Sequence, residues 1–332
     1  MDIKIIKSND IKKIFNMKEA IKASKDALEL YSKGGSEIPL RVSIDVPKED
    51  AKSLYMPGIV EGEEALGLKI VSTYPNNLSK GLETIYSMMV MKNAQTGEIS
   101  SLIDGNYLTK LRTGAVAGAA TDILAREDAK TFTLIGTGGQ ARTQLEAILN
   151  VRAIKEVKIL GRDKEKAKEF VESMREEFGK KYGCNIILAE NPDEAVSDAD
   201  IITAVTTANS PVFDGKKLKE GVHINGIGSF KPDMQEIDPY VIENAGKIYV
   251  DTLDGVLNES GDFIIPLDEG KISKDDIDGE LGDVILGEKP TRENEEEITL
   301  FKSVGTAVLD LISAKRIYDK AIEEGIGENI QL

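Results

Sequence analysis

The 332-residue sequence contains only one cysteine, Cys184, only one histidine, His223, and no tryptophan. A single cysteine excludes an internal disulfide, and together with one histidine it leaves no ligand set for a zinc site. His223 lies in the alternating apolar segment Gly-Val-His-Ile-Asn-Gly-Ile-Gly, which is typical of a buried strand, so we expect a structural role for it. Proton transfer in a catalytic site then falls to lysine, aspartate, glutamate, tyrosine or water.

Long apolar runs are also missing. No segment approaches the roughly 18 apolar residues that a membrane span needs. The first residues, Met-Asp-Ile-Lys-Ile-Ile-Lys, lack the apolar stretch and the cleavage site of a signal peptide. The composition, 41% hydrophobic and 30% charged, is ordinary for a globular protein. We therefore expect a soluble, cytoplasmic protein that does not bind membranes.

Positive charge is scarce, because 42 Lys and Arg residues face 58 Asp and Glu residues and give a net charge of −16. Proteins that bind nucleic acid need a basic surface to neutralise phosphates, and no basic stripe is present. Nucleic acid is therefore excluded as a partner. Acidic residues concentrate between positions 275 and 297, and we interpret this stretch as a solvated surface segment.

The length favours two domains, and from about residue 127 the sequence alternates between apolar strand-like segments, glycine turns and helical segments. The predicted strands are 131–135, 157–160, 185–188, 201–205, 223–227 and 247–250. The predicted helices between them are 140–149, 164–178 and 192–197. This alternation predicts βαβ units and a parallel sheet.

The first 120 residues follow a different pattern, typical of an α+β domain. Helices are predicted at 18–33 and 108–124, and strands at 41–46, 67–71, 85–91 and 99–103, with a hairpin turn at 95–97. A last amphipathic helix, from about Ser303 to Glu324, carries Val304 on its apolar face and is expected to return to this domain. The sequence thus predicts an α/β fold in which a Rossmann domain, 125–302, is inserted in an α+β domain made of 1–124 and 303–332.

The segment Gly136-Thr137-Gly138-Gly139-Gln140-Ala141 is a G-x-G-x-x-A fingerprint placed after a predicted strand and before a predicted helix. In such a loop Gly136 permits the tight turn, Gly138 lets the backbone approach a pyrophosphate, and Ala141 allows close packing of helix and strand. The helix N-terminus then meets the phosphate charge. We therefore expect Gly136, Gly138, Gly139, Gln140 and Ala141 to bind a dinucleotide.

The end of the second Rossmann strand bears on the choice of dinucleotide. An Asp or Glu there holds the ribose hydroxyls of NAD, whereas this chain has Leu160-Gly161-Arg162-Asp163. The guanidinium of Arg162 suits a 2′-phosphate, so NADP(H) is the preferred cofactor. Asp163 keeps NAD(H) open as an alternative.

Several segments resemble the ornithine cyclodeaminase/mu-crystallin family, which also includes archaeal-type alanine dehydrogenases and cyclic ketimine reductases. The likeness covers almost the full length, and its most specific part is Leu108-Thr109-Lys110-Leu111-Arg112-Thr113-Gly114-Ala115 ahead of the glycine loop. Further matching segments are Ile38-Pro39-Leu40-Arg41, Gly67-Leu68-Lys69, Tyr74-Pro75-Asn76-Asn77, Thr96-Gly97-Glu98, Leu102-Ile103-Asp104-Gly105 and Gly228-Ser229-Phe230-Lys231-Pro232-Asp233-Met234.

The resemblance implies roles for individual residues. Arg41, Lys69 and Arg112 would converge on a substrate carboxylate, and Lys69 would also be the catalytic proton donor or acceptor at the substrate nitrogen. The α+β domain would bind the substrate and form a homodimer. Further contacts implied by the resemblance are Thr84, Arg112, Thr113, Ser229 and Ser303 for the cofactor, and Val304 for the substrate.

Position 229 bears on the branch of the family. True cyclodeaminases resemble Gly-Gly-Asp-Cys-Pro-Gly-Lys-Thr-Glu here, whereas this chain has Gly228-Ser229-Phe230. A serine hydroxyl cannot replace the aspartate carboxylate as a base at neutral pH. We therefore expect hydride transfer between NAD(P)H and a small 2-imino or 2-amino acid, as in a ketimine reductase or an alanine dehydrogenase. Two alternatives stay open: an ornithine cyclodeaminase with catalytic NAD, in which Asp233 replaces the missing aspartate, and a non-catalytic NADP(H)-binding protein like mu-crystallin.

Overall fold

The computed structural model describes residues 1–332, which form two compact units. The first unit comprises residues 1–112 and 306–332, and the second comprises 113–305. The sequence predicts these boundaries at 124 and 302. Helix α3 (Gly105–Leu124) runs across the first boundary. Its second half belongs to the second unit because a Cβ on Gly114 would lie only 2.4 Å from the carbonyl oxygen of Thr143, which is close packing that only glycine permits.

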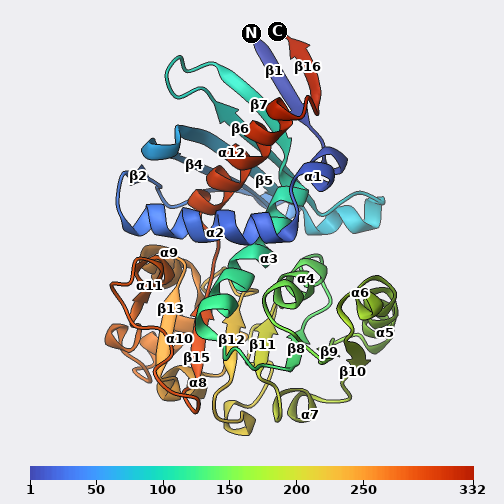
Figure 1. The fold of residues 1–332 in the computed structure, drawn as a ribbon, viewed down its shortest axis with the longest axis vertical. Coiled ribbons are helices and arrows are strands. Elements are labelled where there is room, and N and C mark those ends of the chain that lie inside the picture. The colour runs from blue at the N-terminus through green and yellow to red at the C-terminus, as the bar shows by residue number, and fades with distance from the viewer. The chain divides into compact units, whose positions relative to one another are not determined.

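The first unit is built on an eight-stranded sheet with the order β16-β1-β7-β6-β5-β4-β2, and β3 also pairs with β4. Strands β1 and β7 are parallel, and the other pairs are antiparallel. The strands are β1 (Asp2–Ile6), β2 (Ser36–Glu37), β3 (Val42–Val46), β4 (Ala51–Val60), β5 (Ala65–Thr73), β6 (Ile85–Lys92), β7 (Ile99–Asp104) and β16 (Glu328–Gln331). The two chain ends lie side by side on β1 and β16 (Figure 1).

Three helices complete this unit: α1 (Ser8–Ile14), α2 (Met17–Ser32) and α12 (Ala307–Glu323). Helix α12 crosses one face of the sheet, where it packs on β4 and β5 and contacts α2 (Figure 1). Because α12 begins only at Ala307, the prediction that Ser303 and Val304 belong to this helix is wrong. None of the helices of the protein has the length and continuous hydrophobicity of a membrane span.

Strand β4 was not predicted, because Pro57 and Gly58 interrupt its pattern and proline lacks the amide needed for strand pairing. The pairing explains how the strand accommodates Pro57. On one side, β3 pairs with residues 51–55 and β2 pairs with residues 59 and 60, so Pro57 lies where the neighbouring strand changes.

The second unit contains an all-parallel sheet with the order β10-β9-β8-β11-β12-β15-β13-β14. The strands are β8 (Thr131–Ile135), β9 (Glu156–Leu160), β10 (Asn185–Leu188), β11 (Ile201–Ala204), β12 (His223–Gly226), β13 (Lys247–Val250), β14 (Gly279–Glu280) and β15 (Thr299–Lys302). All six predicted strands are present, and the Rossmann fold is confirmed. The strand order reverses between β8 and β11, which is the point where such sheets bind their ligands.

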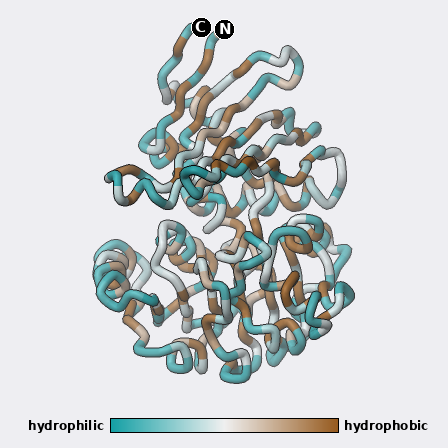
Figure 2. Tube along the Cα trace, turned by 180° about the vertical axis from the view of Figure 1, so that it is seen from behind, coloured by the Kyte–Doolittle hydropathy of each residue, from teal (hydrophilic) through white to brown (hydrophobic).

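Helices α4 (Ala141–Val151), α5 (Lys164–Met174) and α7 (Pro192–Val196) pack on β8, β9 and β10. The remaining helices of this unit are α6 (Lys180–Tyr182), α8 (Pro239–Asn244), α9 (Leu253–Glu259), α10 (Gly261–Asp268) and α11 (Leu281–Ile285). The strands are largely hydrophobic, whereas the peripheral helices and loops are mainly hydrophilic (Figure 2).

The second unit differs from the predicted one in two places. Strand β15 is not among the predicted strands, and the predicted last helix begins at Ser303, directly after it. In the acidic stretch 275–297 none of the acidic residues is buried, as expected for a surface segment, but the stretch also contains β14 and α11, and the side chains of Leu281 and Val284 are buried. Apolar residues spaced along the acidic sequence pack into the core and hold these elements there.

His223 is fully buried on β12, as expected for a structural residue. Its Nδ1 lies 2.9 Å from the hydroxyl of Thr299, and its Nε2 lies 3.2 Å from the side-chain oxygen of Asn225. Burial lowers the pKa of His223 to about 3, so the imidazole is neutral at physiological pH. The only histidine of the chain is thus occupied by hydrogen bonds within the core.

Candidate functional site

Lys69 is placed in the middle of the sheet of the first unit, on β5, and its side chain is only 1% exposed. Its cross-strand neighbours are Met56 on β4 and Met89 on β6, both buried. The surrounding apolar side chains remove the ammonium from water, which is costly for a charged group unless an opposite charge lies close by.

That opposite charge is Asp310, which α12 brings to the same face of the sheet. One carboxylate oxygen of Asp310 lies 2.6 Å from Nζ of Lys69, and the other accepts a hydrogen bond of 2.8 Å from Nε of Arg112 on α3. Asp310 is fully buried and Arg112 is 6% exposed. Three segments distant in sequence, β5, α3 and α12, thus meet at one carboxylate.

Asp310 is a residue of the candidate site that the sequence does not predict. A usable signal was present, because Asp310 interrupts the apolar face of a helix between Val308 and Leu311. A charged residue in the apolar stripe of an amphipathic helix has to find a partner inside the protein.

The electrostatics of this cluster favour proton exchange near neutral pH. Burial lowers the pKa of Lys69 from 10.5 to about 7, and the charges of Arg112 and Arg41 add to this effect, whereas Asp310 opposes it. Burial by itself would raise the pKa of Asp310, but the charges of Arg112 and Lys69 hold it below its usual value. Asp310 therefore stays ionised, and Lys69 is the group that gains and loses a proton.

The three predicted cations are brought together. Arg41, directly before β3, is partly exposed, and its charge acts on Lys69. When Lys69 is protonated, the cluster holds three positive charges against the single negative charge of Asp310. This excess attracts an anion, and the planar guanidinium groups suit a carboxylate.

The glycine loop of the second unit has the geometry that its sequence predicts. Gly136 adopts a φ of 110°, and a Cβ there would lie 2.5 Å from the carbonyl oxygen of Val205, so only glycine fits. In contrast, a Cβ on Gly138 would meet no protein atom within 4 Å. The packing of the protein does not demand glycine at 138, and the open space there leaves room for a ligand to approach the backbone, as the fingerprint predicts.

The start of α4 completes this loop. Ala141 is fully buried against the core, Gly139 is exposed, and Gln140 occupies the N-cap without making a side-chain cap. The first N–H groups of an uncapped helix can receive a phosphate. The open space at Gly138 and this helix start fit the pyrophosphate of a dinucleotide.

At the end of β9, Asp163 caps α5: one of its carboxylate oxygens accepts a hydrogen bond from the backbone N–H of Lys166. Arg162 beside it is exposed. The residue that favours NAD in the sequence is thus also the N-cap of α5.

Ser303, Val304 and Gly305 form a loop after β15 that is fixed by Asp251. The carboxylate of Asp251 accepts hydrogen bonds from the Ser303 hydroxyl at 2.7 Å and from the backbone N–H of Val304 and Gly305 at 3.1 and 2.8 Å. The Ser303 hydroxyl is therefore used within the protein. Contacts of Ser303 with a cofactor and of Val304 with a substrate stay predictions.

The remaining predicted residues lie at different places. Ser229 is fully buried after β12, and its hydroxyl donates to the carbonyl oxygen of Met234. Asp233 in the same loop is exposed. Thr84 lies in the first unit just before β6, and Thr113 accepts a hydrogen bond from the side chain of Gln144 through its carbonyl oxygen. Their cofactor contacts also stay predictions.

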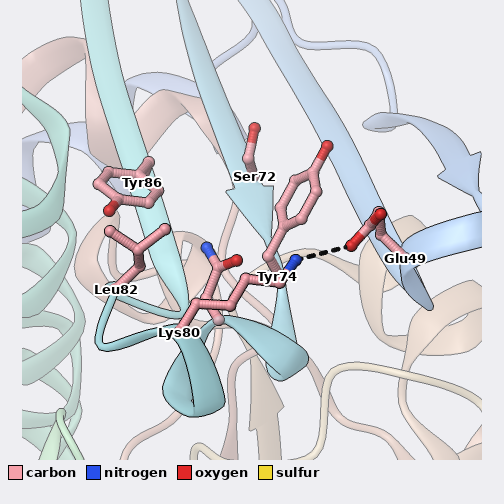
Figure 3. Close-up of a pocket in the computed structure, with 7 residues that line it drawn as sticks. Glu49, Ser72, Tyr74, Lys80, Leu82 and Tyr86 are labelled. Atoms are coloured by element: carbon pink, nitrogen blue, oxygen red, sulfur yellow. Dashed lines mark hydrogen bonds and ion pairs between the residues drawn. The ribbon is translucent and has the colours of Figure 1, made fainter.

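A pocket of about 370 Å³ opens on the first unit and is separate from Lys69. Its lining includes Ser72, Tyr74 and Tyr86, and an ion pair of 2.9 Å between Lys80 and Glu49 borders it (Figure 3). Ser72 and Lys69 are three residues apart on one strand, so their side chains lie on opposite faces of the sheet.

Comparisons with known proteins agree with this geometry. A sequence model of the ornithine cyclodeaminase/mu-crystallin family matches residues 1–325. A Delta(1)-pyrroline-2-carboxylate reductase of Bacillus cereus is 45% identical over 327 residues, 98% of this chain and 99% of that protein. Two solved structures are also similar. The Delta(1)-pyrroline-2-carboxylate reductase of Thermococcus litoralis in complex with NADH and L-proline has a TM-score of 0.93 at 41% identity, covering 99% of this chain and 100% of that chain. An archaeal alanine dehydrogenase dimer with bound NAD has a TM-score of 0.92 at 33% identity, covering all of both chains.

The burial of Asp310 predicts a large effect on stability. Asp310→Asn leaves Lys69 and Arg112 without their counter-charge, so the free energy of unfolding should fall by about 3 kcal/mol in urea denaturation. Asp198→Asn is the matched control, because Asp198 also pairs with a lysine, at 2.7 Å, but is 58% exposed. Its loss should stay below about 1 kcal/mol. Equal losses in the two variants would contradict the central role of Asp310.

Proposed function

The chain belongs to the ornithine cyclodeaminase/mu-crystallin family, and we propose that it reduces a small cyclic 2-imino acid with NAD(P)H. Reduction of 1-pyrroline-2-carboxylate to proline is the leading reaction. The single observation that carries this proposal is the buried cluster of Lys69, Arg112 and Asp310, which combines an anion-attracting charge with a lysine whose pKa is about 7. The similarity to pyrroline-2-carboxylate reductases supports the choice of substrate.

In this reaction Arg41 and Arg112 hold the substrate carboxylate, which orients the ring in the site. Lys69 donates the proton that the imine nitrogen needs, and Asp310 keeps the lysine in place and protonated often enough to act. When bound, the nicotinamide supplies the hydride that adds to the imine carbon. Met56 and Met89 keep water away from the ammonium of Lys69.

The same site also suits alanine dehydrogenase chemistry, because an amino acid formed from an acyclic imine carries the same carboxylate and nitrogen. The alanine dehydrogenase of Archaeoglobus fulgidus, which is 35% identical to this chain, supports alanine dehydrogenase activity as the second candidate function. Ornithine cyclodeaminase chemistry is not favoured for two reasons. Position 229 holds a serine whose hydroxyl donates a hydrogen bond to the carbonyl oxygen of Met234, and the nearby carboxylate of Asp233 is exposed.

The reaction is tested by following the consumption of NADH or NADPH with 1-pyrroline-2-carboxylate, 1-piperideine-2-carboxylate, or pyruvate plus ammonia. We expect rapid consumption with 1-pyrroline-2-carboxylate. The kcat/KM for reduction should fall as the pH rises through about 7, because it reports the free enzyme and reduction needs protonated Lys69; the kcat/KM for proline oxidation should show the opposite trend. A protein that consumes no NAD(P)H but releases ammonia from ornithine with catalytic NAD would be a cyclodeaminase instead.

Lys69→Ala isolates the proton transfer. Turnover should fall by about 10²- to 10⁴-fold, whereas NAD(P)H affinity should not change, because Lys69 and the glycine loop belong to different units. Lys52→Ala, which removes an exposed lysine of the same sheet, should keep normal turnover. Near-normal turnover of Lys69→Ala would remove Lys69 from the mechanism.

For the cofactor, NADP(H) is the form that Arg162 favours, and NADH is the competitor because the Thermococcus litoralis relative was solved with it. Arg162→Asp should weaken NADPH binding by about tenfold or more and leave NADH binding nearly unchanged, because only NADPH carries the 2′-phosphate. Lys168→Asp makes the same charge change on an exposed position of α5 and should affect neither dinucleotide. Equal effects of Arg162→Asp on both dinucleotides would contradict this assignment.

A homodimer through the first unit is part of the proposal, and an uncovered apolar face supports it. The face opposite Lys69 carries a cross-strand row formed by Val42, Tyr55, Ile70 and Met88. The exposed large hydrophobic residues on this unit include Leu40, Val42, Ile44, Leu78, Leu82, Ile85, Tyr86 and Met88. An apolar area of this kind on a soluble enzyme marks an interface, and the archaeal alanine dehydrogenase was described as a dimer.

Ile44→Asp tests the homodimer. Ile44 is 51% exposed, so the charge should convert the dimer to a monomer in analytical ultracentrifugation without unfolding the protein. Ile322→Asp is the control, because Ile322 is 52% exposed but lies on α12, on the opposite side of the sheet. A wild-type protein that sediments as a monomer would overturn the proposed assembly.

A further inference from the structure

Two loops follow β11 and β12 at the carboxyl edge of the Rossmann sheet, and they include Thr206 and Gly228. A sheet of this order has two mononucleotide-binding halves on either side of the switch point. The glycine loop and the end of β9 belong to the first half, which takes the pyrophosphate and the adenosine ribose. The loops after β11 and β12 therefore belong to the half that receives the nicotinamide.

One buried carboxylate, that of Glu236, holds both loops. One of its oxygens accepts hydrogen bonds from the backbone N–H and the hydroxyl of Thr206, at 2.7 and 2.9 Å. The other accepts hydrogen bonds from the backbone N–H of Gly228 at 2.5 Å and of Ser229 at 3.2 Å. Glu236 is fully buried, so these four hydrogen bonds replace its contacts with water.

Glu236 is itself fixed from behind by Asp262. One oxygen of Asp262 accepts hydrogen bonds from the backbone N–H of Glu236 and Ile237, at 2.7 and 3.0 Å. The other oxygen lies 2.6 Å from Nζ of Lys302, at the end of β15. Asp262, Lys302 and Glu236 are all inaccessible to solvent. A continuous chain of hydrogen bonds and one ion pair thus connects β15 to the two loops.

Glycines bring the loops into close contact. A Cβ on Gly228 would lie 2.1 Å from the carbonyl oxygen of Thr206, and a Cβ on Gly136 would lie 2.5 Å from that of Val205. The segment 205–206 is therefore packed between the glycine loop and the loop after β12. A shift of this segment has to move both neighbours.

Buried charges are a poor way to stabilise a fold, because their desolvation costs about as much as their pairing returns. Here the carboxylate of Glu236 is directed at two loops, and Asp262 and Lys302 hold it from behind. We propose that Glu236 is a positioning residue for the nicotinamide end of the cofactor, acting through the loops that contain Thr206 and Gly228. The inference rests on the proposed function, because it takes the ligand of this edge to be a nicotinamide dinucleotide.

Glu236→Gln tests this assignment, because the amide nitrogen cannot accept a hydrogen bond and at least one loop loses its anchor. The affinity is measured for NADH and for ADP-ribose, which has the same adenosine and pyrophosphate groups but no nicotinamide. NADH should bind at least about tenfold more weakly, whereas ADP-ribose should change by less than about twofold. A general loss of stability would weaken both ligands alike.

Asp200→Asn is the matched control. Asp200 also accepts hydrogen bonds from two backbone N–H groups, those of Lys130 and Thr131, but it lies before β11, at the opposite edge of the same sheet. This variant should leave both affinities unchanged. If Glu236→Gln does not fold, Thr206→Val is the milder second variant, since it removes only the hydrogen bond from the Thr206 hydroxyl to Glu236. It should reduce the affinity for NADH and leave the affinity for ADP-ribose unchanged.

Two results would overturn the inference: equal weakening of NADH and ADP-ribose, or unchanged NADH affinity in a folded Glu236→Gln protein. Failure of the proposed function is distinguishable, because it shows in the wild type. A wild-type protein that binds NADH but reduces no imino acid would contradict the reaction and leave the positioning role of Glu236 in force. A wild-type protein that does not bind NADH would overturn both.

Discussion

The carboxylate of Asp310 is the constraint on which the substrate site depends. It is fully buried, and it holds Lys69 and Arg112 at 2.6 and 2.8 Å. Without this anion the two cations would repel each other in a region that water does not reach. The same contacts attach α12, the last helix, to the centre of the sheet. One interaction therefore fixes the end of the chain and arranges the charges of the site.

The Rossmann unit uses buried carboxylates in a comparable way. Asp251 gathers the loop after β15, and Glu236 gathers the loops after β11 and β12. In each case a carboxylate accepts backbone N–H groups at the end of a parallel strand, where the sheet no longer provides partners. The loops at the ligand-binding edge are thereby held in one conformation before a ligand arrives, which lowers the entropic cost of binding.

What the sequence could predict follows from the range of the underlying forces. The strands from β8 to β13 and the turn at Gly136 were predictable because apolar periodicity and glycine chemistry are local. Strand β15 enters the sheet between β12 and β13 although it comes later in the chain, so no local signal gives its place. Asp310 was missed for a related reason: its role appears only when α12 packs over β5. The segment before α12 illustrates the limit, since Ser303 is equally compatible with a helix and with the loop that Asp251 fixes.

The scarcity of histidine explains why a lysine carries the proton in the proposed reaction. The only imidazole, His223, is held neutral in the Rossmann core, so a group with a pKa near 7 had to be made from another side chain. Burial and the neighbouring arginines lower the pKa of Lys69 to about 7. In the proposed site, the positive charge that would attract the substrate carboxylate is thus also the charge that lowers the lysine pKa. A bound carboxylate would add a negative charge beside Lys69 and raise its pKa, so substrate binding would itself load the proton that the imine nitrogen requires.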